Sequence, residues 1–228
     1  MIIDTRAFRA KRRRQGVHVN KEDKKSMATI NKITQKTENR FVNLYDLDVT
    51  HKSGRASHYY VASRARTEAE LKIRTGENHP DGVIIYSIYG PKKDKVVLIR
   101  QYRYPIGGFV YEFPAGLVER GENYREAAIR EMHEETGLTF KPIEVDNMFE
   151  EPRFTTVGMT DESCATVYGY SEGQISDRFL EDSEELEIVL ADRDEVRRIL
   201  KEERVAIMCA YPLMHFLVDE DPFHFLEK

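Results

Sequence analysis

Three glutamates near the end of a predicted helix are the residues of this sequence best suited to chemistry. Residues 122–136 have a glycine at each end, which is typical of one helix. Glu131, Glu134 and Glu135 are spaced i, i+3 and i+4, so they share about a third of its circumference. They add charge where the helix dipole is already negative, and each like-charged pair costs roughly 0.2–0.5 kcal/mol. A divalent cation would compensate, and all-oxygen ligands favour Mg²⁺, with Mn²⁺ as a substitute. A solvated acidic helix face would show the same string.

The residues before this helix favour the metal-binding alternative. Pro114–Glu122 is a glycine-punctuated loop that runs directly into the helix, and glycines permit close backbone approach. Loop and helix together satisfy the pattern G-x5-E-x7-R-E-U-x-E-E-x-G-U, in which U is a bulky aliphatic residue. This is the Nudix box, so the sequence resembles the Nudix hydrolases. The matching positions are Gly116, Glu122, Arg130, Glu131, Met132, Glu134, Glu135, Gly137 and Leu138.

The resemblance implies both a fold and a set of roles. The fold class is α+β: an α/β/α sandwich with a mixed sheet, in which the box forms a loop–helix–loop. Glu131 and Glu135 are implied as primary metal ligands, Glu134 as a ligand through another ion or water, and Ala115 as a ligand through its carbonyl. The implied reaction is metal-assisted hydrolysis of a diphosphate linked to another group. The positions implied to be structural are Gly116, Glu122, Arg130 and Gly137, with Arg130 and Glu122 bracing the loop.

Segments outside the box resemble the ADP-ribose/ADP-sugar pyrophosphatase branch. Gln101-Tyr102-Arg103 is similar to its Q-[YF]-R strand end, and Glu112–Gly116 is similar to its E-[LF]-P-A-G segment. The resemblance implies that Arg103 binds substrate phosphates through its guanidinium fork, and that Glu112 lies near substrate or metals. A surface salt bridge is the alternative for Arg103. ADP-ribose, cleaved to AMP and ribose 5-phosphate, is the expected substrate.

Two β-prone runs, Phe41–Thr50 and His58–Ala65, predict an antiparallel hairpin before the main domain. In the branch, such a module is exchanged between the two subunits of a homodimer, and its aromatic residues clamp the adenine. Phe41 and Tyr59 are the implied clamp, and Arg64 at the end of the hairpin is an implied substrate ligand. The alternative for both rings is hairpin core or dimer interface.

An acidic segment precedes the last predicted strand. The branch often places a mobile catalytic glutamate there, and Glu184 is the first candidate and Glu185 the second. Glu181–Glu187 is acidic throughout, so a solvated loop is the alternative for either one. A carboxylate, from Glu184, Glu185 or Glu134, would position the attacking water or take its proton.

Short β-branched and aromatic runs alternate with helical patterns along the remaining chain, without a regular βαβ rhythm. Ala128, Ile129 and Met132 are expected to form the apolar stripe of the helix at 122–136. The expected domains are a basic tail over residues 1–37, a dimerisation module over 38–78 and a catalytic domain over 79–228. Further strands are predicted at Val83–Tyr89, Lys95–Gln101, Phe109–Phe113, Ile143–Phe149, Ser163–Tyr170 and Leu186–Leu190, and helices at Arg193–Glu202 and Ala206–Val218.

Charge and composition narrow the classes of partner. The net charge is −5, but residues 1–27 carry nine Lys/Arg and three Asp/Glu, which leaves −11 on the other 201 residues. Such an acidic body argues against duplex nucleic acid. The two cysteines lack metal-binding spacing, and no apolar run approaches the ~20 residues of a membrane span. We expect a cytoplasmic protein that acts on a nucleotide-sugar. The alternatives are hydrolysis of another linked diphosphate (flavin dinucleotide, GDP-sugar or dinucleoside polyphosphate), a nucleoside triphosphatase, or an inactive Nudix binding module.

Overall fold

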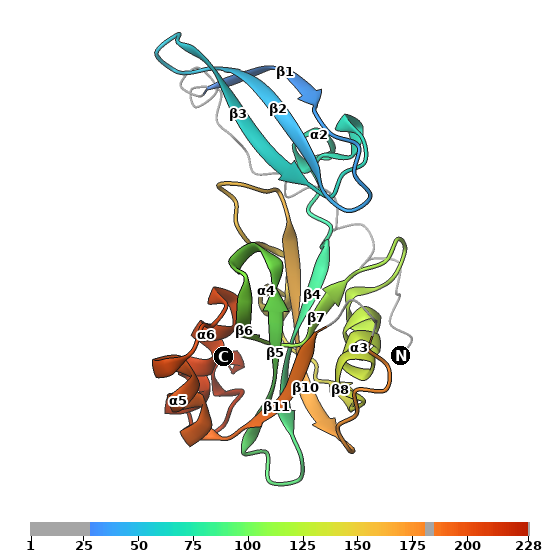
Figure 1. Cartoon of the computed structure of the whole chain (residues 1–228), viewed down its shortest axis with the longest axis vertical. Helices are drawn as coiled ribbons and strands as arrows, with labels where there is room; N and C mark the ends of the chain where they lie inside the picture. Colours follow the sequence, from blue (N-terminus) through green and yellow to red (C-terminus); the bar gives the residue numbers. More distant parts are fainter. Residues whose placement is uncertain (1–27, 181–184, 228) are drawn as a thin grey trace, which may run out of the picture.

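Two separate β-sheets organise the chain (Figure 1). The computed structural model describes residues 28–180 and 185–227. The smaller sheet is antiparallel, in the order β1-β2-β3, and lies beyond one end of the larger sheet. Its strands are β1 (Thr29–Gln35), β2 (Asn43–Thr50) and β3 (Ala56–Ser63).

One face of the small sheet has its own core. Tyr45, Leu47 and Val49 of β2 are buried with Ile33 of β1 and with Leu71 from the segment after β3. Their alternate spacing along β2 is the period of a half-buried strand. Residues 29–35, which were expected to belong to the basic tail, form β1 instead and complete a three-stranded sheet where a hairpin was expected. A third strand gives the stability that a two-stranded hairpin lacks.

The larger sheet is mixed. Its main path runs β11-β5-β4-β10-β8, with β10 parallel to β4 and the other neighbours antiparallel. Short strands β6, β7 and β9 pair with β5, β4 and β10, respectively. The bounds are β4 (Gly82–Tyr89), β5 (Lys95–Arg103), β6 (Gly108–Glu112), β7 (Ala115–Leu117), β8 (Thr139–Pro142), β9 (Arg153–Phe154), β10 (Ser163–Glu172) and β11 (Leu186–Ala191).

Helices cover both faces of this sheet (Figure 1). Helix α3 (Tyr124–Thr136) packs on one face, and α5 (Arg193–Glu202) and α6 (Ile207–Val218) pack on the other. Strand β4 contributes alternate residues to the two cores, Val83 and Ile85 toward α3 and Tyr86 and Ile88 toward α5 and α6. A strand buried on both faces has the continuous apolar run seen here. The expected α/β/α architecture is confirmed.

Two local expectations are wrong. Ile143–Phe149 is not a strand: β8 ends at Pro142, and Asp146 caps a short helix, α4 (Asn147–Glu150), by accepting from the Met148 N–H at 3.0 Å. Ile129 is 44% exposed, and Ala127 is buried with Ala128 and Met132 instead. At about 100° per residue, Ala127, Glu135, Ala128 and Met132 fall within an arc of about 140°, and Ile129 lies about 60° beyond Met132, outside that arc.

Short helical segments complete the described chain. They are η1 (Glu68–Glu70) and α2 (Lys72–Thr75) between the sheets, η2 (Tyr104–Ile106) and η3 (His224–Leu226). None of the helices in the described part is both long and apolar enough to span a membrane.

Candidate active site

Caps at both ends of helix α3 fix where the helix begins and ends, and so the direction in which each of its glutamates faces. Asn123 accepts from the Arg125 N–H at 2.8 Å and caps the start, and Gly137 closes the end in the left-handed region, with φ 72°. Between these caps the Glu135 side chain turns inward and is only 2% exposed, whereas Glu134 is half-exposed. The three predicted carboxylates therefore differ in environment although they share one side of the last turns.

Strand β7 brings the backbone before the helix against these carboxylates. Its antiparallel pairing with β4 aligns Ala115 with Ile84 and Gly116 with Val83. The Ala115 N–H donates to the Glu135 carboxylate at 3.0 Å. A Cβ on Gly116 would lie 1.9 Å from the Glu131 carboxyl carbon, so only glycine allows that carboxylate to rest on the loop.

Arg130 joins the loop to the helix. Its Nε donates to Glu122 at 3.0 Å, and Nη1 reaches Glu131 at 2.8 Å and Glu134 at 2.9 Å. Nη2 donates to the Leu117 carbonyl at 3.0 Å. The hydrogen bonds from Arg130 hold the pKa of Glu122 below its ordinary value, and its carboxylate neighbours raise the pKa of Arg130. Arg130 and Glu122 thus make the contacts that a brace of the loop requires.

Two hollows share the Ala115–Leu117 backbone as part of their lining. One, of about 530 Å³, is lined by Arg130, Glu131 and Glu134. The other, of about 430 Å³, is lined by Arg64, Gln101, Arg103, Glu135, Glu162 and Cys164. We call the two together the cleft. Burial raises the pKa of the Cys164 thiol to about 11, which disfavours its thiolate form at neutral pH.

Two arginines reach the second hollow from different sheets. Arg64 follows β3 of the small sheet and donates to Glu162 at 2.8 Å. Arg103 ends β5 of the large sheet and donates to Glu112 at 2.7 Å. Both arginines, each predicted as a substrate ligand, are therefore held by carboxylates. The sequence interpretation did not place Glu162 in the site, and the available signal was its position directly before the buried strand β10.

A family comparison decides the identity of this arrangement. The NUDIX domain model matches residues 78–210, which include the Ala115–Leu117 backbone, helix α3 and the residues of the larger sheet that line the cleft. The chain belongs to the Nudix family.

Three relatives illustrate its neighbourhood within the Nudix family. The chain is 35% identical over 123 residues to Putative nudix hydrolase 2 of Caenorhabditis elegans, covering 51% of this chain and 54% of the relative. It is 35% identical over 111 residues to the ADP-ribose pyrophosphatase of Saccharomyces cerevisiae (47% and 48%), and 30% identical over 110 residues to that of Bacillus subtilis (48% and 56%). The chain thus spans about half the length of these curated relatives.

A solved structure shares the Nudix fold. The crystal structure of an ADP compounds hydrolase superposes with a TM-score of 0.56 over 77% of this chain and 84% of that chain, at 19% identity. At that identity the likeness concerns the fold alone.

The Nudix box offers carboxylate oxygens, which are the type of ligand that a hard cation such as Mg²⁺ prefers. Glu131 and Glu134 line the same hollow, and Gly116 leaves room beside Glu131. In the described residues, however, no three His, Cys, Asp or Glu side chains converge closely enough to enclose a metal ion. The bonds from Arg130 hold Glu131 and Glu134 in this arrangement, so a cation would have to exchange with the guanidinium.

The remaining predicted residues lie around the Nudix core. Phe41 and Tyr59 are largely exposed on the small sheet and are not part of the cleft lining, within the part of the chain that the structure describes. Arg40 lies over the Phe41 ring at 4.8 Å, and the Tyr59 hydroxyl donates to the Gly158 carbonyl at 2.6 Å. Glu185 is exposed directly before β11, and its carbonyl accepts from the Tyr102 N–H at 2.9 Å. Glu184 lies outside the described residues.

Proposed function

We propose that this Nudix-family chain is a Mg²⁺-dependent hydrolase of the diphosphate bond in a nucleotide-sugar, and that ADP-ribose is cleaved to AMP and ribose 5-phosphate. The observation that carries the proposal is the gathering of arginines and glutamates in two hollows that share the Ala115–Leu117 backbone. Arg64 and Arg103 line one hollow together with Glu135 and Glu162, and Glu131 and Glu134 line the other together with Arg130. A diphosphate with its cation needs both kinds of group. The two ADP-ribose pyrophosphatases among the relatives support the choice of substrate.

The chain's own residues supply binding and orientation. Phosphate oxygens replace Glu162 as the partner of Arg64 and Glu112 as the partner of Arg103, because a guanidinium fork binds either anion in the same geometry. Glu131, Glu134 and Glu135, with the Ala115 carbonyl, are the proposed ligands of Mg²⁺ or Mn²⁺. When bound, the ion neutralises phosphate charge and lowers the pKa of a bound water.

The hydrolytic step needs a carboxylate to orient water. Water adds its oxygen to one phosphorus, the bridging P–O bond breaks, and the leaving phosphate keeps the bridging oxygen. Glu134, Glu184 and Glu185 are the candidates to accept the water proton. The pairing of Leu186 with Gln101, which lines the cleft, supports Glu185 as a candidate.

A homodimer is part of the proposal. Tyr59 touches the loop before β10 through its bond to Gly158, and on that loop Val157 is 72% and Met159 is 69% exposed. With Tyr59, these side chains form an exposed apolar surface where β3 meets that loop, which we call the junction patch. Large exposed apolar patches mark interaction sites. A second copy that covers the patch would place Phe41 and Tyr59 where they can stack on a base, a contact worth about 1–3 kcal/mol.

A two-stage phosphate assay on the purified chain tests the proposal. ADP-ribose, flavin dinucleotide, a GDP-sugar, a dinucleoside polyphosphate and nucleoside triphosphates are each incubated with the protein, with and without Mg²⁺, and then treated with phosphatase. We expect phosphatase-sensitive product from ADP-ribose only when Mg²⁺ was present, and AMP on chromatography. Faster cleavage of another diphosphate would reassign the substrate. Absence of product from every compound, with Mg²⁺ or Mn²⁺, would leave only a binding module.

A further inference from the structure

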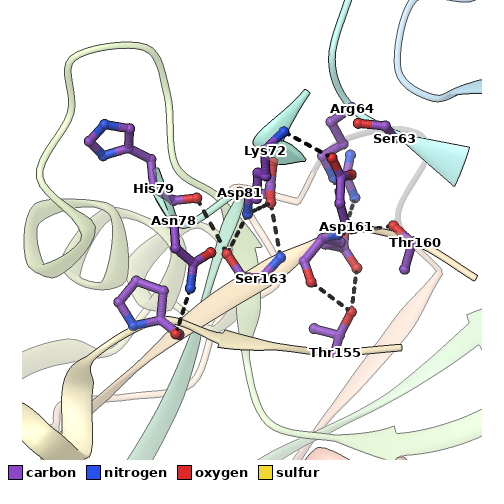
Figure 2. A network of polar contacts seen from close by, with 12 residues as sticks. Ser63, Arg64, Lys72, Asn78, His79, Asp81, Thr155, Thr160, Asp161 and Ser163 are labelled. Atoms are coloured by element: carbon purple, nitrogen blue, oxygen red, sulfur yellow. Dashed lines mark hydrogen bonds and ion pairs between the residues drawn. The ribbon is translucent and has the colours of Figure 1, made fainter. Parts of the chain in front are cut away.

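A buried lysine joins the linker between the two sheets to the larger sheet. Lys72 begins α2, and its side chain is only 15% exposed. Its ammonium donates to Asp81 at 2.6 Å and also to the Ser163 hydroxyl (Figure 2). A lysine this buried is held by what it binds, because desolvation of its charge must be offset by close partners.

The two partners of Lys72 stand at the starts of adjacent strands. Asp81 directly precedes β4, and Ser163 is the first residue of β10. They also bind one another, because the Ser163 N–H donates to the Asp81 carboxylate at 2.9 Å and the Asp81 N–H donates to the Ser163 carbonyl at 2.8 Å. Lys72, Asp81 and Ser163 therefore form one network. The next residues along the two strands, Gly82 and Cys164, line the cleft.

The network continues into the residue that holds Arg64. The Lys72 N–H donates to Asp161 at 3.4 Å, and Glu162 stands between Asp161 and Ser163 in the sequence. One carboxylate oxygen of Glu162 accepts from Thr155 at 3.1 Å, and the other accepts from Arg64. Residues on both sides of Glu162 thus contact Lys72, Asp161 through the Lys72 backbone N–H and Ser163 through the ammonium.

We propose that Lys72 is a positioning residue that fixes Glu162, and through Glu162 fixes Arg64, at the phosphate side of the cleft. The inference rests on the proposed function, since it assigns to that reaction a residue outside the family box. Lys72 itself does not line the cleft; it lines a separate apolar hollow of about 360 Å³ beside Leu71 and Phe154. Its effect on the substrate is therefore indirect, and it must disappear when Arg64 is absent.

Lys72→Met removes the ammonium while it keeps a side chain of similar length. We expect the KM for ADP-ribose to rise roughly tenfold or more, since small displacements of binding groups have large effects. The kcat is expected to change less than about threefold, because a phosphate contact that is equal in the ground and transition states affects KM alone. Lys72→Arg keeps two donors for Asp81 and Ser163 and should restore most of the affinity. The control is Lys141→Met on β8, which breaks an exposed pair with Glu172 of β10 and should leave KM unchanged.

A double-mutant cycle separates positioning from general damage. In the Arg64→Ala background, Lys72→Met should have no further effect on KM, because coupled residues are non-additive. Equal effects of Lys72→Met with and without Arg64, or an unchanged KM in the single variant, would overturn the proposal. If the wild type turns over no substrate, the proposed function fails, and the same cycle is then measured with ADP binding by calorimetry. Additive losses of ADP affinity, or no ADP binding by the wild type, would overturn the positioning role as well.

Discussion

At the scale of single residues, every arginine of the cleft is already matched by a carboxylate. Arg64 binds Glu162, Arg103 binds Glu112, and Arg130 binds Glu122, Glu131 and Glu134 in the described structure. An anion alone would have to compete with these carboxylates, and a cation alone would have to compete with Arg130. A diphosphate that arrives with its divalent cation offers a new partner to both sets of groups. The phosphates would bind the arginines, and the cation would bind the glutamates. Metal and substrate are therefore expected to bind cooperatively.

Glu131→Gln is the first prediction at this scale. The amide keeps the shape beside Gly116 but removes the charge, so turnover should fall by more than the roughly 10–100-fold that loss of an outer metal partner costs. Steady-state kinetics at saturating Mg²⁺ measure the change, and circular dichroism checks the fold. Glu126→Gln, an exposed change in the first turn of the same helix, is the control. Turnover at the wild-type rate would remove Glu131 from the proposed ligands.

The pair of Glu122 and Arg130 predicts a pH dependence of stability. The bonds from Arg130 lower the pKa of Glu122 in the folded chain. Its contribution should be fully present above the ordinary glutamate pKa of about 4.3 and be lost as the pH falls through the lowered folded value. Unfolding of the wild type and Glu122→Gln by urea, between pH 3 and pH 7, measures the difference. The gap in free energy should narrow toward pH 3, and a constant gap would contradict this assignment.

The sequence predicts some of these residues better than others. Loop and helix positions follow from one contiguous pattern, so Gly116, Glu131 and Glu135 could be placed together before any fold was known. The partner of Arg64 could not, because Glu162 is 98 residues away and is brought there by the docking of one sheet on the other. Acidic residues in a segment such as 181–187 share one composition, so no local feature distinguishes a base among them.

At the scale of elements, capping residues and the strength of the apolar pattern determine how closely the predicted bounds match the structure. Helix α5 has the predicted bounds because Asp192 caps it and an amphipathic pattern follows. The strand predicted at 143–149 does not form. Its apolar residues suit a strand as well as a turn of helix, and the N-cap provided by Asp146 favours the helix. Strand β1 was missed because only one residue of Thr29–Gln35 is fully buried, so its apolar pattern is weak.

Asp192→Ala tests the capping of α5. Its carboxylate accepts from the Asp194 and Glu195 N–H groups at 3.1 and 2.9 Å, so its loss should lower the free energy of unfolding by about 1 kcal/mol. Activity should be unchanged, since α5 packs on the face opposite to α3. Asp194→Ala removes an exposed pair with Arg197 and should change stability by less than about 0.5 kcal/mol. Equal losses in the two variants, measured by thermal or urea unfolding, would show that charge alone stabilises this end.

At the scale of the whole molecule, the two sheets divide the work of binding. Helix α3 on the larger sheet carries the glutamates, β5 of that sheet ends in Arg103, and Arg64 follows β3 of the small sheet, which docks on the loop before β10. That docking includes the Ala62 N–H, which donates to the Met159 carbonyl at 2.9 Å. Outside residues 1–27 the chain has a net charge of −11, so an anionic substrate depends on these local arginines and on a cation.

The junction patch predicts the oligomeric state. Val157→Asp with Met159→Asp places two charges in the proposed interface between copies, and should weaken dimerisation at least about tenfold. Sedimentation equilibrium at micromolar concentration measures the shift from dimer to monomer. The control is Ile207→Asp with Tyr211→Asp on the outer face of α6, where the replaced side chains are similarly exposed. If the α6 variant dissociates and the junction variant does not, the two copies meet through α6. The dimer would then give Phe41 and Tyr59 no role in stacking on the base. A monomeric wild type would likewise remove the dimer, and each cleft would have to bind its nucleotide with Arg64 and Arg103 of a single chain.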